Sequence, residues 1–108
     1  MPALLQRRLL SIAEELIADS SRIIFIDEPL TDLDEKDAGT VVRVMQILVK
    51  MRYTVVATFH ELSNDVLKVF GSVHLLCKGR IAFSGSVDQV SQFFTGSQYK
   101  VSSTIIRL

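Results

Sequence analysis

The chain of 108 residues has little cysteine, little histidine and no net charge, and each shortage excludes a class of protein. Its one cysteine, Cys77, cannot form an internal disulfide, which fits a reducing compartment. One cysteine and two separated histidines, His60 and His74, cannot build a zinc cluster. Because 12 basic residues balance 12 acidic ones, the overall charge gives no electrostatic case for nucleic-acid binding.

Long apolar runs are lacking as well. No uninterrupted run approaches the roughly 20 residues of a transmembrane helix. Acidic residues interrupt the apolar N-terminal stretch, so it is not a secretory signal peptide. A hydrophobic fraction of 48% and a mean hydropathy of +0.32 nevertheless supply a core for one small domain. The sequence therefore predicts a folded domain that is soluble by itself or peripheral to a membrane.

Apolar periodicity predicts helices and strands in alternation. Helical spacing and short continuous apolar runs follow one another, and the runs are typical of strands buried on both faces of a parallel sheet. The expected elements are helix 3–18, strand 22–26, helix 36–51, strand 53–59, helix 62–70, strands 72–77 and 80–85 joined at Lys78-Gly79 as a tight hairpin, and helix 87–94 capped by Ser86.

This order predicts an α/β protein with a mostly parallel sheet flanked by helices, ending in a β-hairpin and a helix. Residues 96–108 favour β structure but have no evident partner strand, so the expected domain covers residues 1–95 and residues 96–108 are an unassigned tail. Ligands of parallel sheets bind at the carboxyl ends of the strands. Two such ends carry polar residues, Asp27-Glu28 and His60.

Asp27 and Glu28 directly follow the apolar run of residues 23–26, and Pro29 ends the strand. An aspartate in this place can hold Mg²⁺, directly or through water. A neighbouring glutamate can position or deprotonate an attacking water. Two acids alone would more often only solvate a strand end, but the apolar run before them and the proline after them favour a functional site.

His60 ends the next predicted strand. A neutral imidazole there can hydrogen-bond a phosphate oxygen or a water, although a lone histidine at a strand end is more often structural. Because neighbouring parallel strands end at the same sheet edge, we expect His60 to lie beside Asp27 and Glu28. Asp34 can cap the following helix or bind a cation, and the helix-forming sequence directly after it favours capping.

Together these motifs resemble the C-terminal half of the nucleotide-binding domain of ATP-binding cassette (ABC) transporters. The stretch IIFIDEP resembles the Walker B strand of that family, LTDLD its D-loop and TFHE its switch histidine. The stretch LLCKGRIAFSGSVDQVSQFF resembles the closing hairpin and helix, and RRLLSIAEELI the helix after the signature loop. Within the family, RRLLSIAEEL and TFHELSNDVLKVF are most similar to the G subfamily of exporters.

The chain also departs from the family pattern. Its 108 residues include neither the phosphate loop G-x-x-x-x-G-K-[ST] nor an LSGGQ-type signature loop. Asp32 replaces the glycine that the family usually has in the D-loop, and Glu61-Leu62 stand where the subfamily usually has glutamine and proline. The strand that leads into the phosphate loop is not among the expected elements, so we expect one exposed sheet edge.

The resemblance implies a partial P-loop NTPase-like fold. It also implies a metal-binding Asp27, a catalytic Glu28 and His60, and a cofactor-binding Asp34. It implies Mg²⁺ and ATP as cofactors of the complete domain, with weak or no nucleotide binding by this chain alone. The implied partners are an N-terminal cassette half, a transmembrane domain and a second nucleotide-binding domain, at the cytoplasmic face of a membrane. No nucleic-acid partner is expected.

Three functions remain open at this point. The chain can be part of the ATPase domain of an exporter, in which case it is catalytically incomplete by itself. It can instead be a non-catalytic cassette-like interaction module that pairs with an intact ATPase subunit. It can also belong to a cassette ATPase of the DNA-repair or chromosome-cohesion type, but the hairpin and final helix of residues 73–95 and the zero net charge favour the transporter branch.

Overall fold

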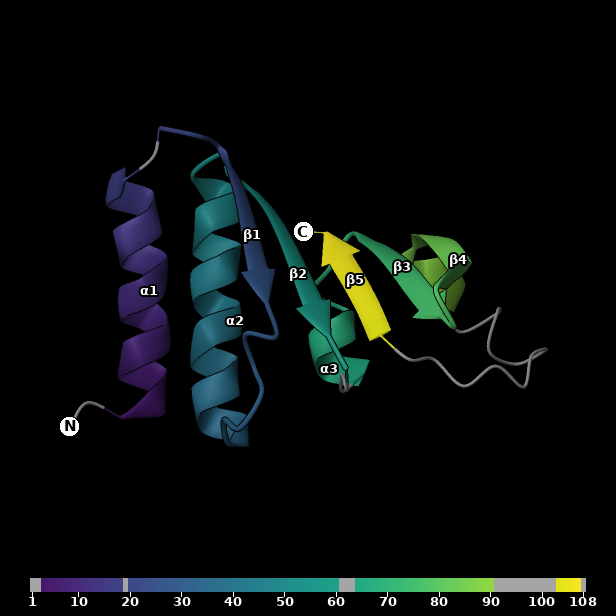
Figure 1. Cartoon of the computed structure of the whole chain (residues 1–108), viewed down its shortest axis with the longest axis horizontal. Coiled ribbons are helices and arrows are strands. Elements are labelled where there is room, and N and C mark those ends of the chain that lie inside the picture. Colours follow the sequence, from purple (N-terminus) through teal and green to yellow (C-terminus); the bar gives the residue numbers. More distant parts are fainter. Residues whose placement is uncertain (1–2, 19, 61–63, 91–102, 108) are drawn as a thin grey trace.

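A computed structural model describes residues 3–18, 20–60, 64–90 and 103–107 as an α/β structure with a five-stranded sheet (Figure 1). The elements in chain order are α1 (Leu4–Ala18), β1 (Ile23–Asp27), α2 (Glu35–Lys50), β2 (Thr54–Phe59), α3 (Asn64–Leu67), β3 (Ser72–Cys77), β4 (Arg80–Ser86) and β5 (Ser103–Arg107). The predicted α/β class with a β-hairpin near its end is confirmed, although only the pair β1–β2 is parallel. Within the described ranges, none of the helices is long and apolar enough to cross a bilayer.

The helix α2 begins at Glu35, one residue before the predicted start, because Asp34 caps it. The Oδ1 atom of Asp34 accepts a hydrogen bond of 2.8 Å from the backbone N–H of Asp37. Acidic residues in the first turn and Lys50 in the last turn complement the helix dipole. The apolar face of α2 then packs on β2, with Val41 and Met45 completely buried.

The core lies on the sheet face that α2 covers. Alternate residues of β2 point into it, because successive side chains of a strand point to opposite faces. Its buried members are Ile12, Val41, Val42, Met45, Leu48, Val55, Ala57, Phe59, Phe70, Val73, Leu75 and Val90. Phe59 and Phe70 meet edge to face, with ring centroids 5.5 Å apart. This cluster joins α1, α2, β2 and β3 into one domain.

The predicted hairpin of β3 and β4 is confirmed. Lys78 and Gly79 have φ angles of +50° and +74°, the left-handed values that a two-residue turn of type I′ needs. Beyond β4, residues 87–90 are helical, and the backbone N–H of Ser86 donates to Oε1 of Gln89 at 3.3 Å, which is half of a capping box. Residues 91–94 of the predicted last helix lie outside the described ranges.

The strand order β1-β2-β5-β3-β4 differs from the expectation at the C-terminus. β5 pairs antiparallel with β2 on one side and with β3 on the other, so the tail supplies a central strand. The expectation that this tail has no partner strand is wrong for residues 103–107, because the edges of β2 and β3 offer backbone partners on both sides. The sheet is therefore mixed, with β1 and β2 paired in parallel. The boundary between residues 95 and 96 stays a prediction.

β1 is one of the two edge strands of the sheet, with β4 at the other end, and one face of β1 is exposed. This strand is the first in the order, and Ile23 and Phe25 are 53% and 78% exposed. The expectation that β1 is buried on both faces is wrong, although Ile24 and Ile26 do pack against the core. The reason is visible in Figure 1, where α1 and α2 lie together on one side of β1. A continuous apolar run shows that a strand could be buried on both faces. It does not show whether helices cover both faces.

This asymmetry predicts unequal effects of two truncations. Phe25→Ala should change the free energy of unfolding by no more than about 0.5 kcal/mol, because the side chain already lies in solvent. Met45→Ala, at a completely buried position of α2, should cost about 2–5 kcal/mol. Urea denaturation of both variants measures this difference. Equal losses for the two variants would contradict the one-sided burial of β1.

Candidate nucleotide-binding edge

The carboxyl ends of β1 and β2 meet at one edge of the sheet. The two strands pair in parallel with Asp27 opposite Thr58, so Glu28 and His60 each follow a strand that ends at this edge. The structure brings Glu28 and His60 into contact, with His60 Nε2 against Glu28 Oε1. Sequence reasoning expected these groups to lie together, and the parallel register is the cause.

Thr58 connects the two acids. Its hydroxyl donates a hydrogen bond to Oδ1 of Asp27 and accepts one of 3.0 Å from the backbone N–H of Glu28. The same N–H lies 3.1 Å from the carbonyl oxygen of Thr58. One side chain of β2 therefore fixes the carboxylate of Asp27 and the backbone of Glu28 at once.

The backbone turns sharply at Glu28. Its φ angle of +48° is in the left-handed region, which non-glycine residues rarely adopt. Arg8 of α1 supports this turn from the other side, because its Nη1 donates a hydrogen bond of 2.9 Å to the carbonyl oxygen of Glu28. Pro29 follows and is buried. Contacts from β2 and α1 thus hold a strained residue in place, as is common where a side chain must be aimed.

The Glu28–His60 pair remains open to solvent. The side chains of His60 and Glu28 are 63% and 35% exposed, and Asp27 is exposed as well. A ligand can therefore reach all three groups at this edge. A carboxylate can accept a proton from a water, and an imidazole can hydrogen-bond a water or a phosphate oxygen.

The donor set fits a magnesium ion that the substrate helps to bind. Among the described residues, no group of three or more His, Cys, Asp or Glu side chains gathers as a metal cage. Mg²⁺ does not need such a cage, because it keeps several waters and binds through one or two carboxylates plus substrate phosphates. The exposed carboxylate of Asp27 can supply one such ligand.

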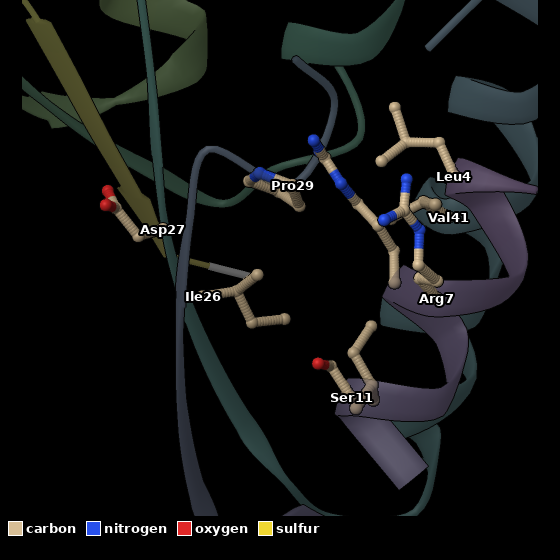
Figure 2. A pocket seen from close by; sticks show the side chains of 9 residues that line it. Leu4, Arg7, Ser11, Ile26, Asp27, Pro29 and Val41 are labelled. Carbon is tan, nitrogen blue, oxygen red and sulfur yellow. The ribbon is translucent and has the colours of Figure 1, made fainter. Parts of the chain in front are cut away.

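A cavity of about 380 Å³ lies on the other side of β1, between this strand and α1. It is lined by Leu4, Arg7, Arg8, Ser11, Ile12, Ile26, Asp27, Pro29 and Val41. Figure 2 shows Ile26 pointing toward α1, whereas the carboxylate of Asp27 points to the opposite side of the strand. The carboxylate of Asp27 thus points away from the arginine-lined cavity, although Asp27 is one of the residues that line it.

Sequence reasoning missed Thr58 and Arg8. A weak signal for Thr58 existed, since a hydroxyl two residues before His60 falls on the same strand face and, once the register is known, opposite Asp27. Arg8 gave no signal, because its partner is a backbone carbonyl 20 residues away in the sequence. The prediction that Asp34 binds a cofactor stays a prediction, and Glu61 lies outside the described residues.

Most of the chain is similar in sequence to known proteins. No protein-family model matches it. The broad substrate specificity ATP-binding cassette transporter ABCG2 of Mus musculus is 33% identical over 94 residues, which are 87% of this chain and 14% of that protein. The ABC transporter G family member 42 of Oryza sativa subsp. japonica is 41% identical over 88 residues, 81% of this chain and 6% of that protein.

The ATP-dependent permease PDR11 of Saccharomyces cerevisiae is 33% identical over 90 residues, which are 82% of this chain and 6% of that protein. The chain belongs to the G subfamily of ABC transporters. It spans 14% or less of the length of these three relatives. The chain therefore corresponds to a segment of such a transporter. The resemblance to ABC transporters that the sequence motifs indicated is confirmed.

Asp32, which replaces the glycine usual in the family, keeps the backbone conformation that glycine favours. Asp32 has a φ angle of +64°, so this loop, which resembles a D-loop, has the left-handed backbone for which glycine is best suited. Aspartate is among the few other residues that adopt this conformation readily. The turn is closed by a hydrogen bond of 3.2 Å from the N–H of Leu33 to the carbonyl of Leu30. The substitution therefore changes the side chain while the path of the loop stays compatible with glycine.

Removing the Thr58 hydroxyl should weaken the edge measurably. Thr58→Val keeps the shape but leaves the Asp27 carboxylate and the Glu28 N–H without this partner, at a cost of about 1–3 kcal/mol in the free energy of unfolding. Thr58→Ser keeps the hydroxyl and should lose less than about 1 kcal/mol. Urea denaturation compares the two variants. Equal stability would show that the hydroxyl bridge contributes nothing.

A second prediction concerns Asp32, in the loop between β1 and α2. Asp32→Gly should leave the free energy of unfolding within about 1 kcal/mol, because relief of the left-handed backbone offsets the greater freedom of the unfolded chain. Asp32→Val should cost about 1–3 kcal/mol, since a β-branched residue resists positive φ. Thr31→Val, at the preceding exposed position, is the matched control and should change stability little. Thermal unfolding measures all three, and a tolerated Asp32→Val would refute the argument.

Proposed function

We propose that this chain supplies the Walker B edge of the ATPase site of a G-subfamily ABC transporter. The observation that carries the proposal is the contact of His60 with Glu28 at the carboxyl ends of two parallel strands, beside the exposed Asp27. Open α/β sheets bind their ligands at such strand ends. The relatives support the nucleotide chemistry, because two of their names describe an ATP-binding cassette transporter and an ATP-dependent permease.

The three groups would divide the work at this edge. Asp27 would hold Mg²⁺, and Thr58 would keep its carboxylate oriented. Glu28 would accept the proton of the water that attacks the γ-phosphate. His60 would turn from Glu28 to that water or to a γ-phosphate oxygen, which its exposure permits. The bound metal would neutralise phosphate charge in the complete site.

Asp34 has a different place in this proposal. Its Oδ1 caps α2, so Asp34 can act on a nucleotide through the position of the loop that it anchors. Direct contact with the cofactor would use the other carboxylate oxygen, because Oδ1 serves the cap. We therefore assign Asp34 to positioning the loop that lies next to the nucleotide.

By itself the chain would be catalytically incomplete. A phosphate loop surrounds the phosphates with backbone N–H groups and neutralises them with a lysine, and no such sequence occurs in these 108 residues. Arg8, the cationic group nearest to Glu28 in the hydrogen-bond network, is engaged with a backbone carbonyl. We therefore expect weak or no binding of Mg-ATP by this chain alone.

The activity of a whole transporter is part of the proposal. Such a protein would couple ATP binding and hydrolysis to export across a membrane, with this segment at the cytoplasmic face. Its partners would be an N-terminal cassette half with the phosphate loop, a transmembrane domain and a second nucleotide-binding domain. The alternative, a non-catalytic module that pairs with an intact ATPase subunit, predicts the same association without hydrolysis at Glu28.

The test combines the chain with a separately produced N-terminal cassette half that carries the phosphate loop. We expect no measurable ATP turnover by the chain alone and turnover after mixing. In the mixture, Glu28→Gln should lower turnover by about 10²–10⁴-fold, the usual effect of losing a general base. Glu35→Gln, the same chemical change at an exposed position in the first turn of α2, is the control and should keep turnover.

The outcomes separate the two functions. Association without turnover would favour the non-catalytic module. Full turnover by Glu28→Gln would reject Glu28 as the base. Micromolar binding of Mg-ATP to the chain alone, measured by calorimetry, would contradict the incomplete site.

A further inference from the structure

The strand β5 connects two parts of the sheet that nothing else in the strand order joins. It pairs along β2 from Val56 to Phe59 and along β3 from Ser72 to Leu76. On one side of it lie β1 and β2, and on the other side β3 and β4. Without β5, both β2 and β3 would present unpaired backbone N–H and C=O groups across a gap one strand wide.

The direction of β5 is the opposite of that of its neighbours. β5 is antiparallel to both β2 and β3, so β2 and β3 run parallel to each other. β1 runs parallel to β2 as well. In Figure 1 the arrow of β5 points against those of β1, β2 and β3. β5 therefore interrupts what would otherwise be a parallel arrangement.

The direction decides what reaches the candidate nucleotide-binding edge. Because Thr104 lies opposite Phe59, β5 begins at the edge where His60 follows β2, and it ends at the far edge. A phosphate-binding loop follows the carboxyl end of a strand and leads into a helix. Within this gap, only a strand parallel to β2 would deliver such a loop beside Glu28 and His60. β5 cannot do so in its present direction.

We propose that β5 is a displaceable occupant of the gap between β2 and β3, and that the partner fitting this gap is a parallel strand from outside these 108 residues whose following loop binds phosphate. This inference rests on the proposed function, because it says how the complementary half would join the site. Strand addition to exposed sheet edges is an established mode of recognition. The C-terminal strand would thus compete with the partner that completes the site.

Whether β5 or the partner strand occupies the gap depends on how each strand is attached to the sheet. β5 is covalently joined to the rest of the sheet, and covalent linkage of two binding elements typically gives an effective concentration of about millimolar. Antiparallel pairing is also slightly more stable per residue than parallel pairing. A partner strand must therefore gain further contacts, such as those of its following helix, in order to displace β5.

A reversible crosslink in the full-length chain tests the position of β5. In a Cys77→Ser background, cysteines replace Val56 and Arg107, which lie directly opposite each other. Opposed antiparallel residues have Cα atoms about 4.5–5.5 Å apart, within disulfide reach. Oxidation with diamide should therefore join them within one chain, as intact mass and peptide mapping would show. Absence of this disulfide would overturn the placement of β5.

A register control accompanies this variant. Cysteines at Val56 and Thr104 are three positions out of register, or about 10 Å along the strand. This pair should not join under the same conditions. Equal crosslinking of both pairs would show that β5 does not hold the register and would overturn the proposal.

The oxidised and reduced forms then test displacement. A labelled peptide with the sequence of residues 101–108 should bind the reduced form, in which β5 can leave, and binding should be lost on oxidation. The N-terminal cassette half with the phosphate loop should show the same loss. Equal binding of the half to both forms would overturn displacement. Binding of the peptide without binding of the half would overturn the proposed occupant and the complementation behind it, while the strand site itself would stand.

Discussion

The parallel register of β1 and β2 is the constraint on which the candidate site depends. It places Asp27 opposite Thr58, so one hydroxyl can bond both the carboxylate of Asp27 and the backbone of Glu28. It also brings Glu28 to His60, which follows the neighbouring strand. A shift by one residue would point Thr58 to the other face of the sheet and break all of these contacts together.

The same site depends on packing at some distance from it. The core between α2 and β2 holds these two elements together, and Asp34 fixes the start of α2 through its cap. Arg8 of α1 then binds the carbonyl of Glu28 and supports a left-handed residue. The side chains proposed to do chemistry are exposed, whereas the contacts that aim them come from a strand, a helix and a buried core.

Much of the fold was predictable where the cause is local. Asp34 caps a helix because its carboxylate bonds an N–H three residues later, and Lys78-Gly79 turns a hairpin because of two backbone angles. Predictions failed where the cause is distant. The run Ile23–Ile26 does not reveal that only one of its faces is covered, and the tail does not reveal which edge it will pair with. Thr58 and Arg8 escaped notice for the same reason.

By itself, the sequence determined the α/β class, the turns and caps, the ABC resemblance and the identity of the acids that end β1. These are properties of neighbouring residues and of periodicity, which a chain carries before it folds. Only the tertiary structure decided that β5 lies between β2 and β3, that β1 is an edge strand with one exposed face and that Thr58 joins Asp27 to Glu28. Strand order and register depend on backbone groups that all residues share, so pairing is selected by the packing of the whole sheet.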